Sequence, residues 1–289
     1  MKSGFVSIVG MPNVGKSSLL NVIVGQKISI VSKKPQTTRN RVLGIYNTKD
    51  YQIVFVDTPG LIIKKDNKLA EFMSAEISQG SKDVDVTVVV IAADKGMSDK
   101  ELVLIERSAK KNKVVVAVNK IDLVDYEKLF PLLEEIGKIK GVNEVVPICA
   151  KTGKNTGTLI KILKDFMPEG GPFFDEDEVT DKSLRFMAGE LIREKALSLL
   201  NEEVPHGIFV DIEVFEEKKG LVRIEAALVV ERESHKAIVI GKNGQKIKEI
   251  GTRARVAIEK LVDCKVFLKL FVKVRQNWRD DKARVNELK

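Results

Sequence analysis

Continuous apolar runs constrain the fold of this chain more than any other feature of its sequence. Two of them, "VTVVVIAA" at residues 86–93 and "VVVAVNK" at residues 114–120, suit strands that are buried on both faces, as in a parallel sheet covered by helices. Shorter apolar runs cover residues 5–9, 41–46, 52–56 and 144–148, and stretches with helical periodicity cover residues 16–24, 69–80, 99–112, 126–140 and 155–166. The alternation predicts a doubly wound α/β sheet with ligand loops at the carboxyl ends of its strands. The pair 41–47 and 51–57, joined by a short polar turn, predicts an antiparallel hairpin.

Composition limits the class of protein. A length of 289 residues with 44% hydrophobic and 31% charged residues is typical of a soluble globular protein with one large domain or two ordinary ones. No apolar run approaches the roughly 20 residues that a bilayer span needs, and residues 1–9 are too short for a secretory signal. A cytoplasmic location is therefore expected. Cys149 and Cys264 lack the spacing of a metal site or a disulfide framework.

Positive charge is concentrated near the C-terminus. Residues 235–289 contain 15 Lys and Arg against 6 Asp and Glu, whereas the preceding residues contain 34 against 35. This segregation favours a module that binds a polyanion. A solvated Lys-rich face is the alternative.

The stretch "GMPNVGKSS" at residues 10–18 follows an apolar run and precedes a helical pattern, as a P-loop does. Its glycines allow the backbone N–H groups to surround a phosphate, and the helix N-terminus adds partial positive charge. Lys16 is expected to reach the β and γ phosphates, and the Ser17 hydroxyl to ligate Mg²⁺. A Gly-rich structural turn is the alternative. The residues predicted to hold the nucleotide here are Gly10, Asn13, Val14, Gly15, Lys16, Ser17 and Ser18.

Two further motifs stand at predicted strand ends. In "VDTPG", Asp57 is expected to bind Mg²⁺ through water and the Gly60 amide to contact the γ-phosphate, although Asp before Pro-Gly is also common turn chemistry. In "NKID", the Asp122 carboxylate can accept hydrogen bonds from the ring N–H and amino group of guanine, whereas adenine presents a lone pair. Asn119 can bond a base edge, and the Lys120 stem can lie over the ring. The three motifs together predict binding of GTP and GDP.

With these motifs the chain resembles the translation-factor-like GTPases. The resemblance implies that "CAK" is the fifth nucleotide element, where Cys149 replaces the usual Ser and the Ala150 amide, followed by Lys151, meets the guanine carbonyl oxygen. It also implies that "PQTTRNR" is the first switch, with Thr38 as the magnesium ligand in preference to Thr37.

The expected catalytic residues are Lys16, Thr38, Gly60 and Asn13. Many GTPases position the attacking water with a Gln after the Gly60 equivalent, but this chain has Leu61, so slow intrinsic hydrolysis is expected. Two interpretations of Asn13 stay open. Related GTPases with Asn at this place can hold a potassium ion against the phosphates, and the alternative is that Asn13 stabilises the loop turn.

The second half of the chain has a different pattern. Pro, Gly and acidic residues predict a linker at 168–182 between a GTPase domain at 1–167 and a domain at 183–289. Its predicted elements are a helix near 183–201, strands near 208–215 and 221–230, and a strand at 265–275. One face of the last strand alternates Val and Leu. The opposite face, with Lys265, Phe267, Lys269, Phe271 and Lys273, has two interpretations, a stacking surface for bases or a cover for the first domain.

Residues 241–244, "GKNG", form a GxxG loop before a basic helix. In this context the segment resembles the KH module, an α+β fold whose loop clamps a single-stranded RNA backbone. The residues that the resemblance assigns to RNA binding are Lys236, Gly241, Lys242, Asn243, Gly244, Lys246, Lys248 and Arg253.

A P-loop GTPase followed by a type II KH domain resembles the Era family of bacterial ribosome-assembly GTPases across nearly the whole chain. The resemblance implies a monomeric switch that binds the 3′ end of small-subunit rRNA on the 30S subunit, with GTP favouring the RNA-competent state. It also implies peripheral membrane association, which nothing in the sequence itself indicates. Two alternatives remain: an RNA-binding protein with a vestigial nucleotide pocket, and a GTPase whose basic C-terminal region binds anionic lipid.

Overall fold

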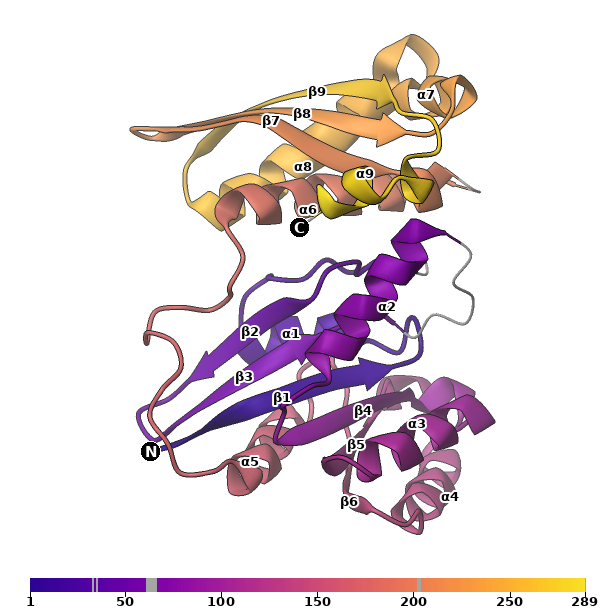
Figure 1. Cartoon of the computed structure of the whole chain (residues 1–289), viewed down its shortest axis with the longest axis vertical. Coiled ribbons are helices and arrows are strands. Elements are labelled where there is room, and N and C mark those ends of the chain that lie inside the picture. The colour runs from indigo at the N-terminus through magenta and orange to yellow at the C-terminus, as the bar shows by residue number, and fades with distance from the viewer. Residues whose placement is uncertain (33, 35, 61–66, 202–203, 289) are drawn as a thin grey trace. The chain divides into compact units, whose positions relative to one another are not determined.

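The computed structural model describes residues 1–32, 34, 36–60, 67–201 and 204–288. The chain forms two compact units (Figure 1). The first comprises Met1–Ser29, Thr38–Ile63 and Met73–Asp181, and the second comprises Ile30–Thr37, Lys64–Phe72 and Lys182–Lys289. In the described part of the chain, every helix is too short or too polar to cross a membrane.

The first unit contains a six-stranded sheet in the order β2-β3-β1-β4-β5-β6. Its strands are β1 (Lys2–Gly10), β2 (Val42–Asn47), β3 (Tyr51–Asp57), β4 (Val86–Ala92), β5 (Lys113–Asn119) and β6 (Val142–Pro147). All neighbouring pairs are parallel except the β2–β3 hairpin. Every residue of β4 is buried, as continuous apolar strands of a covered parallel sheet should be. The doubly wound sheet and its antiparallel hairpin are therefore confirmed.

Five helices cover this sheet. They are α1 (Lys16–Val24), α2 (Lys68–Gly80), α3 (Asp99–Ala109), α4 (Tyr126–Gly137) and α5 (Thr156–Phe166). Figure 1 shows α2 in front of the sheet and α1 behind it. Ile105 of α3 and Ile136 of α4 pack in one core cluster with Val89 and Val116 of the sheet. Ser98 and Glu101 form a capping box that fixes the start of α3.

The acidic stretch expected to be a linker lies along the first unit. The Ser3 amide donates to the Pro168 carbonyl at 3.0 Å, and the Ile45 amide donates to the Val179 carbonyl at 3.0 Å. The Gln52 side-chain oxygen Oε1 also accepts a hydrogen bond from the Phe173 amide at 2.7 Å. The residues up to Asp181 group with the first unit, and the limits of 167 and 183 for the domains stay predictions.

The second unit contains a three-stranded sheet in the order β7-β8-β9. Its elements are α6 (Leu184–Leu199), β7 (Phe209–Lys218), β8 (Leu221–Val230), α7 (Glu233–Ile240), α8 (Gln245–Val262), β9 (Lys265–Val274) and the short α9 (Lys282–Asn286). β7 and β8 are antiparallel, and β8 and β9 are parallel. The unit is thus the predicted smaller α+β fold.

One face of this second sheet packs on α6 and α8. Ile224, Leu228 and Val266 share a core cluster with Leu191 of α6 and Ile258 of α8. The Val and Leu positions of β9 all contact that cluster, which confirms the alternation predicted for this strand. β9 pairs with β8 on one side and is the last strand of this sheet.

The sequence pattern did not predict α7 or α9. The C-terminal segment is fixed by Trp278, which is buried, donates from Nε1 to the Gly207 carbonyl at 2.9 Å, and places its ring 4.7 Å from that of Phe209. Arg275 adds an ion pair with Asp211 at 3.0 Å. These contacts fold the segment after β9 back onto β7.

Candidate active site and nucleic-acid interface

The three nucleotide motifs meet at one edge of the first sheet. Gly10 ends β1, Asp57 ends β3 and Asn119 ends β5. Because these strands are parallel, their carboxyl ends lie at the same edge. Between β1 and α1 the loop reverses at Gly15, whose φ is 102°. A Cβ there would lie 2.2 Å from the Asn119 side-chain nitrogen, so this position requires glycine.

Lys16 is a buried cation at the centre of this edge. Its Nζ donates to the carbonyls of Gly10 and Met11, both at 3.1 Å. Burial lowers the Lys16 pKa to about 8, and the attraction of Asp57 opposes this shift. A Cβ on Gly60 would lie 3.3 Å from Nζ, so the Gly60 backbone stands beside the amine. A phosphate bound here would supply the negative charge that the buried amine favours.

Three oxygen-bearing side chains gather next to Lys16. The Ser17 hydroxyl donates to Asp57 Oδ2 at 2.8 Å, and it lies 2.9 Å from the Thr38 hydroxyl. Asp57 Oδ1 is buried and has no hydrogen-bond partner among the described residues. Burial raises the Asp57 pKa, while Lys16 and the hydroxyls of Ser17 and Ser29 counteract the rise. An orphaned carboxylate oxygen among hydroxyls is a donor set that fits Mg²⁺.

The two candidate threonines of the first switch differ in their contacts. The Thr38 hydroxyl belongs to the oxygen cluster around Ser17, whereas the Thr37 hydroxyl donates to the Lys34 carbonyl at 2.6 Å. The geometry therefore favours Thr38 as the metal ligand. Leu61, on which the expectation of slow hydrolysis rests, lies outside the described residues.

Ser29 is a site residue that sequence reasoning missed. Its buried hydroxyl donates to Asp57 Oδ2 at 2.9 Å. Asn21 of α1 holds the Ser29 backbone, since Asn21 Nδ2 donates to the Ser29 carbonyl at 2.7 Å and the Ser29 amide donates to Asn21 Oδ1 at 2.9 Å. No local pattern marks Ser29, because its partner Asp57 is 28 residues away.

The base-binding loops are tied together by Asn119. Its Nδ2 donates to the Val14 carbonyl at 2.8 Å, and its Oδ1 accepts from the Ala150 amide at 2.8 Å. The amide expected to meet the guanine carbonyl thus contacts Asn119 in this structure. The Cys149 thiol donates to Asp122 Oδ1 at 3.2 Å, which holds the exposed carboxylate that should select guanine.

The remaining residues of the predicted site surround these loops. Lys120 has a left-handed backbone with φ 65° and pairs with Asp94 at 3.6 Å. Asn13 is exposed with φ 64°, Ser18 lies in the first turn of α1, and Lys151 is exposed.

The GxxG loop joins α7 to α8 in the second unit. Gly241, Asn243 and Gly244 have φ values of 71°, 51° and 72°. A Cβ on Gly241 would lie 2.7 Å from the Lys246 Cβ, so the loop can approach α8 this closely only with glycine there. Lys242 and Asn243 are exposed at the tip of the loop, where a phosphate could reach their backbone.

A shallow groove of about 260 Å³ lies between α8 and β9. Its lining residues are Ile247, Lys248, Gly251, Thr252, Arg255, Leu268 and Leu270. Of the cations predicted to bind RNA, Lys248 lines this groove. Lys236 lies on α7 and pairs with Glu233 at 3.8 Å.

Two cations of α8, Arg253 and Arg255, lie differently with respect to this groove, and the RNA-binding role of Arg253 stays a prediction. Arg253 lies five residues after Lys248, on another side of the helix, and pairs with Glu249 at 2.6 Å. Arg255, which was not among the predicted RNA-binding residues, lines the groove. Helical spacing could have identified it, because seven residues are almost two turns and place Arg255 on the same side as Lys248.

Comparisons with known proteins agree with this geometry. Residues 5–120 match the family described as 50S ribosome-binding GTPase, and residues 203–279 match the KH domain family. GTPase Era of Clostridium kluyveri is 46% identical over 290 aligned positions that cover 100% of this chain and 99% of the relative. GTPase Era of Geotalea daltonii is 44% identical and covers 99% of this chain and 96% of the relative.

Two solved structures share the whole fold. A variant of Aquifex aeolicus Era bound to GDP.AlF4⁻ has a TM-score of 0.95 and 40% identity, with 100% of this chain and 99% of the other covered. Era in complex with MgGDPNP and nucleotides 1506–1542 of 16S ribosomal RNA has a TM-score of 0.95 and 41% identity, with 100% and 98% covered. The chain therefore belongs to the Era family and is a GTPase with a C-terminal KH domain.

Proposed function

We propose that this GTPase binds GTP with Mg²⁺ at the sheet edge described above and couples its hydrolysis to binding of small-subunit rRNA during maturation of the 30S subunit. The observation that carries the proposal is the convergence of buried Lys16, the Ser17–Thr38–Asp57 oxygen cluster and Asp122 at one edge. Complexes of related proteins with MgGDPNP, GDP.AlF4⁻ and 16S rRNA support it.

Each residue of the site has a physical role in this proposal. Lys16 binds the β and γ phosphates and neutralises charge that develops as the terminal phosphoryl group leaves. Ser17 and Thr38 would hold Mg²⁺ through their hydroxyls, with Asp57 acting through a bound water. When bound there, the ion would supply positive charge that offsets the negative charge developing on the phosphates. The Gly60 N–H orients the γ-phosphate, and Asn13 has either the potassium role or the loop role.

Guanine selection is tested at Asp122. In Asp122→Asn, the amide nitrogen is a donor that opposes the guanine amino group, so GTP binding should weaken and preference should shift to xanthosine triphosphate, which carries a carbonyl oxygen in place of that amino group. Competition between GTP, ATP and xanthosine triphosphate for a fluorescent nucleotide measures this. Equal affinity of the parent protein for ATP and GTP contradicts the assignment.

RNA binding is tested at the GxxG loop. Replacing Lys242 and Asn243 by Asp places two carboxylates where phosphates should bind, so affinity for an RNA equivalent to nucleotides 1506–1542 of 16S rRNA should fall at least tenfold. GTP binding should not change. The control is the replacement of exposed Lys110 and Lys111 by Asp in the first unit.

Undetectable hydrolysis with intact RNA binding would instead favour the alternative of an RNA-binding protein with a vestigial nucleotide pocket.

Peripheral membrane association is a separate proposal that comes from the family resemblance, and in it the basic segment 235–289 would bind anionic lipid. Anionic lipid and RNA should then compete for the same cations. Vesicles containing phosphatidylserine, added to a fluorescent RNA complex, measure the competition against vesicles of neutral phosphatidylcholine. Unchanged RNA binding and no co-sedimentation with anionic vesicles contradict this role.

A further inference from the structure

A second hollow lies at the far end of α8 from the GxxG loop. It has a volume of about 490 Å³ and is formed by the tip of the β7–β8 hairpin, the start of β9 and the last turns of α8. The lining residues that matter below are Lys218, Leu221, Arg223, Arg255, Lys265 and Phe267. We call it the hairpin-end hollow.

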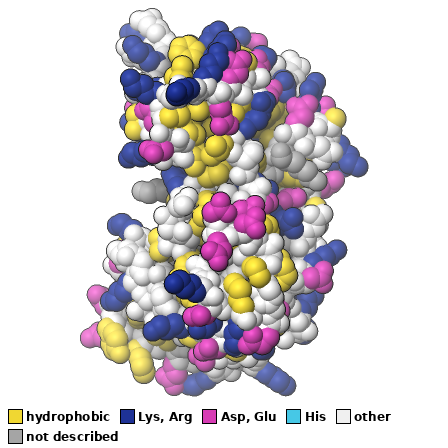
Figure 2. Space-filling view, turned by 90° about the vertical axis from the view of Figure 1, so that its left-hand side faces the viewer, with side chains coloured by type: hydrophobic (Ala, Val, Ile, Leu, Met, Phe, Trp, Pro, Cys, Tyr) yellow, Lys and Arg dark blue, Asp and Glu magenta, His cyan; other side chains and the backbone are white. Residues whose placement is uncertain are grey.

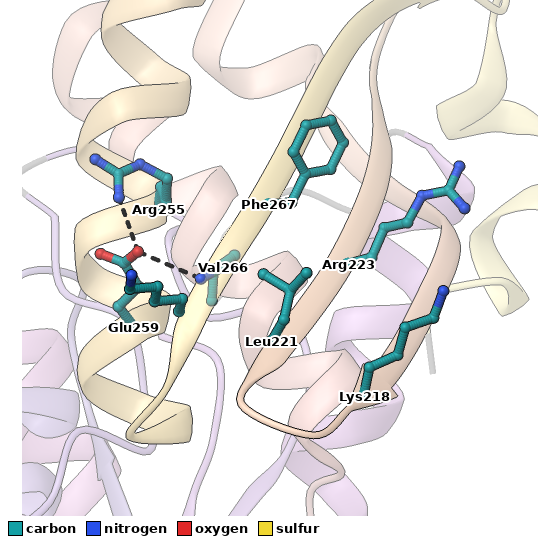
Figure 3. A pocket seen from close by; sticks show the side chains of 8 residues that line it. Lys218, Leu221, Arg223, Arg255, Glu259, Val266 and Phe267 are labelled. Atoms are coloured by element: carbon teal, nitrogen blue, oxygen red, sulfur yellow. Dashed lines mark hydrogen bonds and ion pairs between the residues drawn. The ribbon is translucent and has the colours of Figure 1, made fainter.

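The hairpin-end hollow adjoins the groove between α8 and β9. Arg255 lines both, and β9 supplies Leu268 and Leu270 to the groove and Lys265 and Phe267 to the hollow. In Figure 3, Arg255 projects from α8 on one side of β9, and Leu221, Arg223 and Lys218 lie on the other side. An extended polymer that follows β9 from the groove therefore reaches the hollow next.

The hollow combines an exposed aromatic ring with cations. Phe267 is 52% exposed and Leu221 is 38% exposed, and neither belongs to the core cluster of this unit. Arg223 is the Cα partner of Phe267 across the β8–β9 pair, so the two residues are neighbours on the same face of the sheet. Figure 2, which views the molecule from the hairpin side, shows Lys and Arg side chains around a hydrophobic area near the top.

The cations of the hollow differ in whether an ion pair with another described residue holds them in position. Arg255 pairs with Glu259 at 2.7 Å, and Arg223 pairs with Glu225 and Glu216, so both guanidinium groups are held in position. Lys265 is exposed at the start of β9. The lining contains four cations against one carboxylate, and Glu216 and Glu225 beside it pair with Lys218 and Arg223. The local balance is therefore only slightly positive, and the exposed Lys265 is the cation most available to an anionic occupant.

We propose that the hairpin-end hollow is a second RNA subsite, in which one unpaired base stacks on Phe267 while Arg223 and Lys265 contact the adjacent phosphates. The inference rests on the proposed RNA binding by the GxxG loop and the groove between α8 and β9. A KH groove holds about four nucleotides, so a longer strand must continue beyond it. An exposed ring between cations fits a nucleotide better than an acidic peptide, because a peptide carboxylate uses the cations and leaves the ring in water.

The test measures binding of fluorescent RNAs to the full-length protein by anisotropy. One probe is the RNA equivalent to nucleotides 1506–1542 of 16S rRNA, and nested truncations from each end define the shortest RNA that still binds. The variants are Phe267→Ala, Phe267→Tyr and Lys265→Gln. Phe130→Ala is the matched control, because Phe130 is 57% exposed on α4 of the first unit.

Phe267→Ala should weaken binding of the long RNA by roughly fivefold to a hundredfold, the effect of losing one stacked base. Phe267→Tyr should retain binding, since the ring remains. The shortest RNA should bind the parent and Phe267→Ala equally. Lys265→Gln should reduce the slope of log affinity against log salt by about 0.7, the value for one phosphate contact of a single strand.

Two results would overturn the subsite. One is equal affinity of the parent and Phe267→Ala for the long RNA, and the other is an equal loss for the long and shortest RNAs, which indicates damage to the groove between α8 and β9. Displacement of the long RNA by poly-glutamate in the parent but not in Lys265→Gln would assign the hollow to an acidic protein instead. Failure of the proposed function is distinguishable, because the Lys242 and Asn243 replacements would then leave binding of every RNA unchanged.

Discussion

At the residue scale, Ser29 belongs to the oxygen cluster that is proposed to hold Mg²⁺. It is one of two hydroxyls that donate to Asp57 Oδ2, the other being Ser17. Both donors bind Oδ2, and the Oδ1 atom has no hydrogen-bond partner among the described residues, so Oδ1 would be the atom that accepts from the water shell of a bound ion. The Asn21 contacts fix Ser29 through its backbone, so the donor needs little reordering when the ion binds.

Ser29→Ala should therefore weaken Mg²⁺ binding roughly tenfold, because a hydrogen bond to a charged group contributes about 1.5–3 kcal/mol. Titration of GTP hydrolysis with Mg²⁺ measures the effect, and maximal turnover at saturating Mg²⁺ should be nearly that of the parent. The control is Ser198→Ala, since Ser198 is exposed and donates to the Lys195 carbonyl of its own helix. An unchanged Mg²⁺ requirement would show that Ser17 alone positions Asp57.

Lys16 should make nucleotide binding depend on pH. In the free protein its pKa is lowered to about 8 by burial, and bound phosphates should raise it because they stabilise the charged amine. Binding near pH 8 should therefore take up roughly half a proton, and affinity should fall as the pH rises above 8. Below about pH 7 the amine is already charged and uptake should disappear.

Calorimetry of GDP binding in two buffers with different ionisation enthalpies measures this uptake. The experiment is done with EDTA, so that metal binding at Asp57 adds no proton release. Proton uptake that stays zero between pH 7 and 9 would contradict the lowered pKa.

Within the P-loop, Asn13 has two proposed roles, stabilising the loop turn or holding a potassium ion. Its left-handed backbone, with φ 64°, is a conformation that Asn tolerates better than most residues, which supports the loop role. Its exposed position within the P-loop is compatible with the potassium role. The two roles predict different cation dependence.

If Asn13 holds potassium, GTP turnover should be at least several-fold faster in potassium than in sodium buffer, and Asn13→Ala should remove the difference, because the ion neutralises charge in the transition state. If Asn13 only shapes the loop, both proteins should be insensitive to the cation, and the variant should lose nucleotide affinity. Hydrolysis rates in matched chloride buffers decide between them. Cation-independent rates would leave the rRNA or a ribosomal protein as the expected activator.

For the whole molecule, the switch proposal requires a free-energy coupling between the nucleotide and the RNA. If GTP favours the RNA-competent state, a non-hydrolysable GTP analogue should raise RNA affinity over GDP by about 5- to 150-fold, the usual range of allosteric coupling. RNA must then raise analogue affinity relative to GDP by the same factor. Anisotropy titrations in both directions, with the RNA and with a fluorescent nucleotide, test the equality. Identical RNA affinity in the two nucleotide states would exclude the switch.

The sequence by itself determined the sheet and the identity of the nucleotide motifs. Continuous apolar runs such as 86–93 indicate a strand covered on both faces, and the structure buries every residue of β4. Gly10, Asp57 and Asn119 end three strands that the sequence already marked. Because parallel strands present their carboxyl ends at one edge, a local pattern was enough to predict that these motifs meet. The alternation of β9 was also readable from the sequence, because successive side chains of a strand point to opposite faces of the sheet.

Tertiary structure alone decided which further residues complete the sites. Ser29 reaches Asp57 across 28 residues, Asn119 joins Val14 to Ala150, and Trp278 fixes the C-terminal segment on Gly207. Arg255 lies between the groove and the hairpin-end hollow because α8 lies beside β9. Periodicity reports which side of an element is apolar, but a polar contact between distant segments depends on how the elements pack, and no local pattern encodes that.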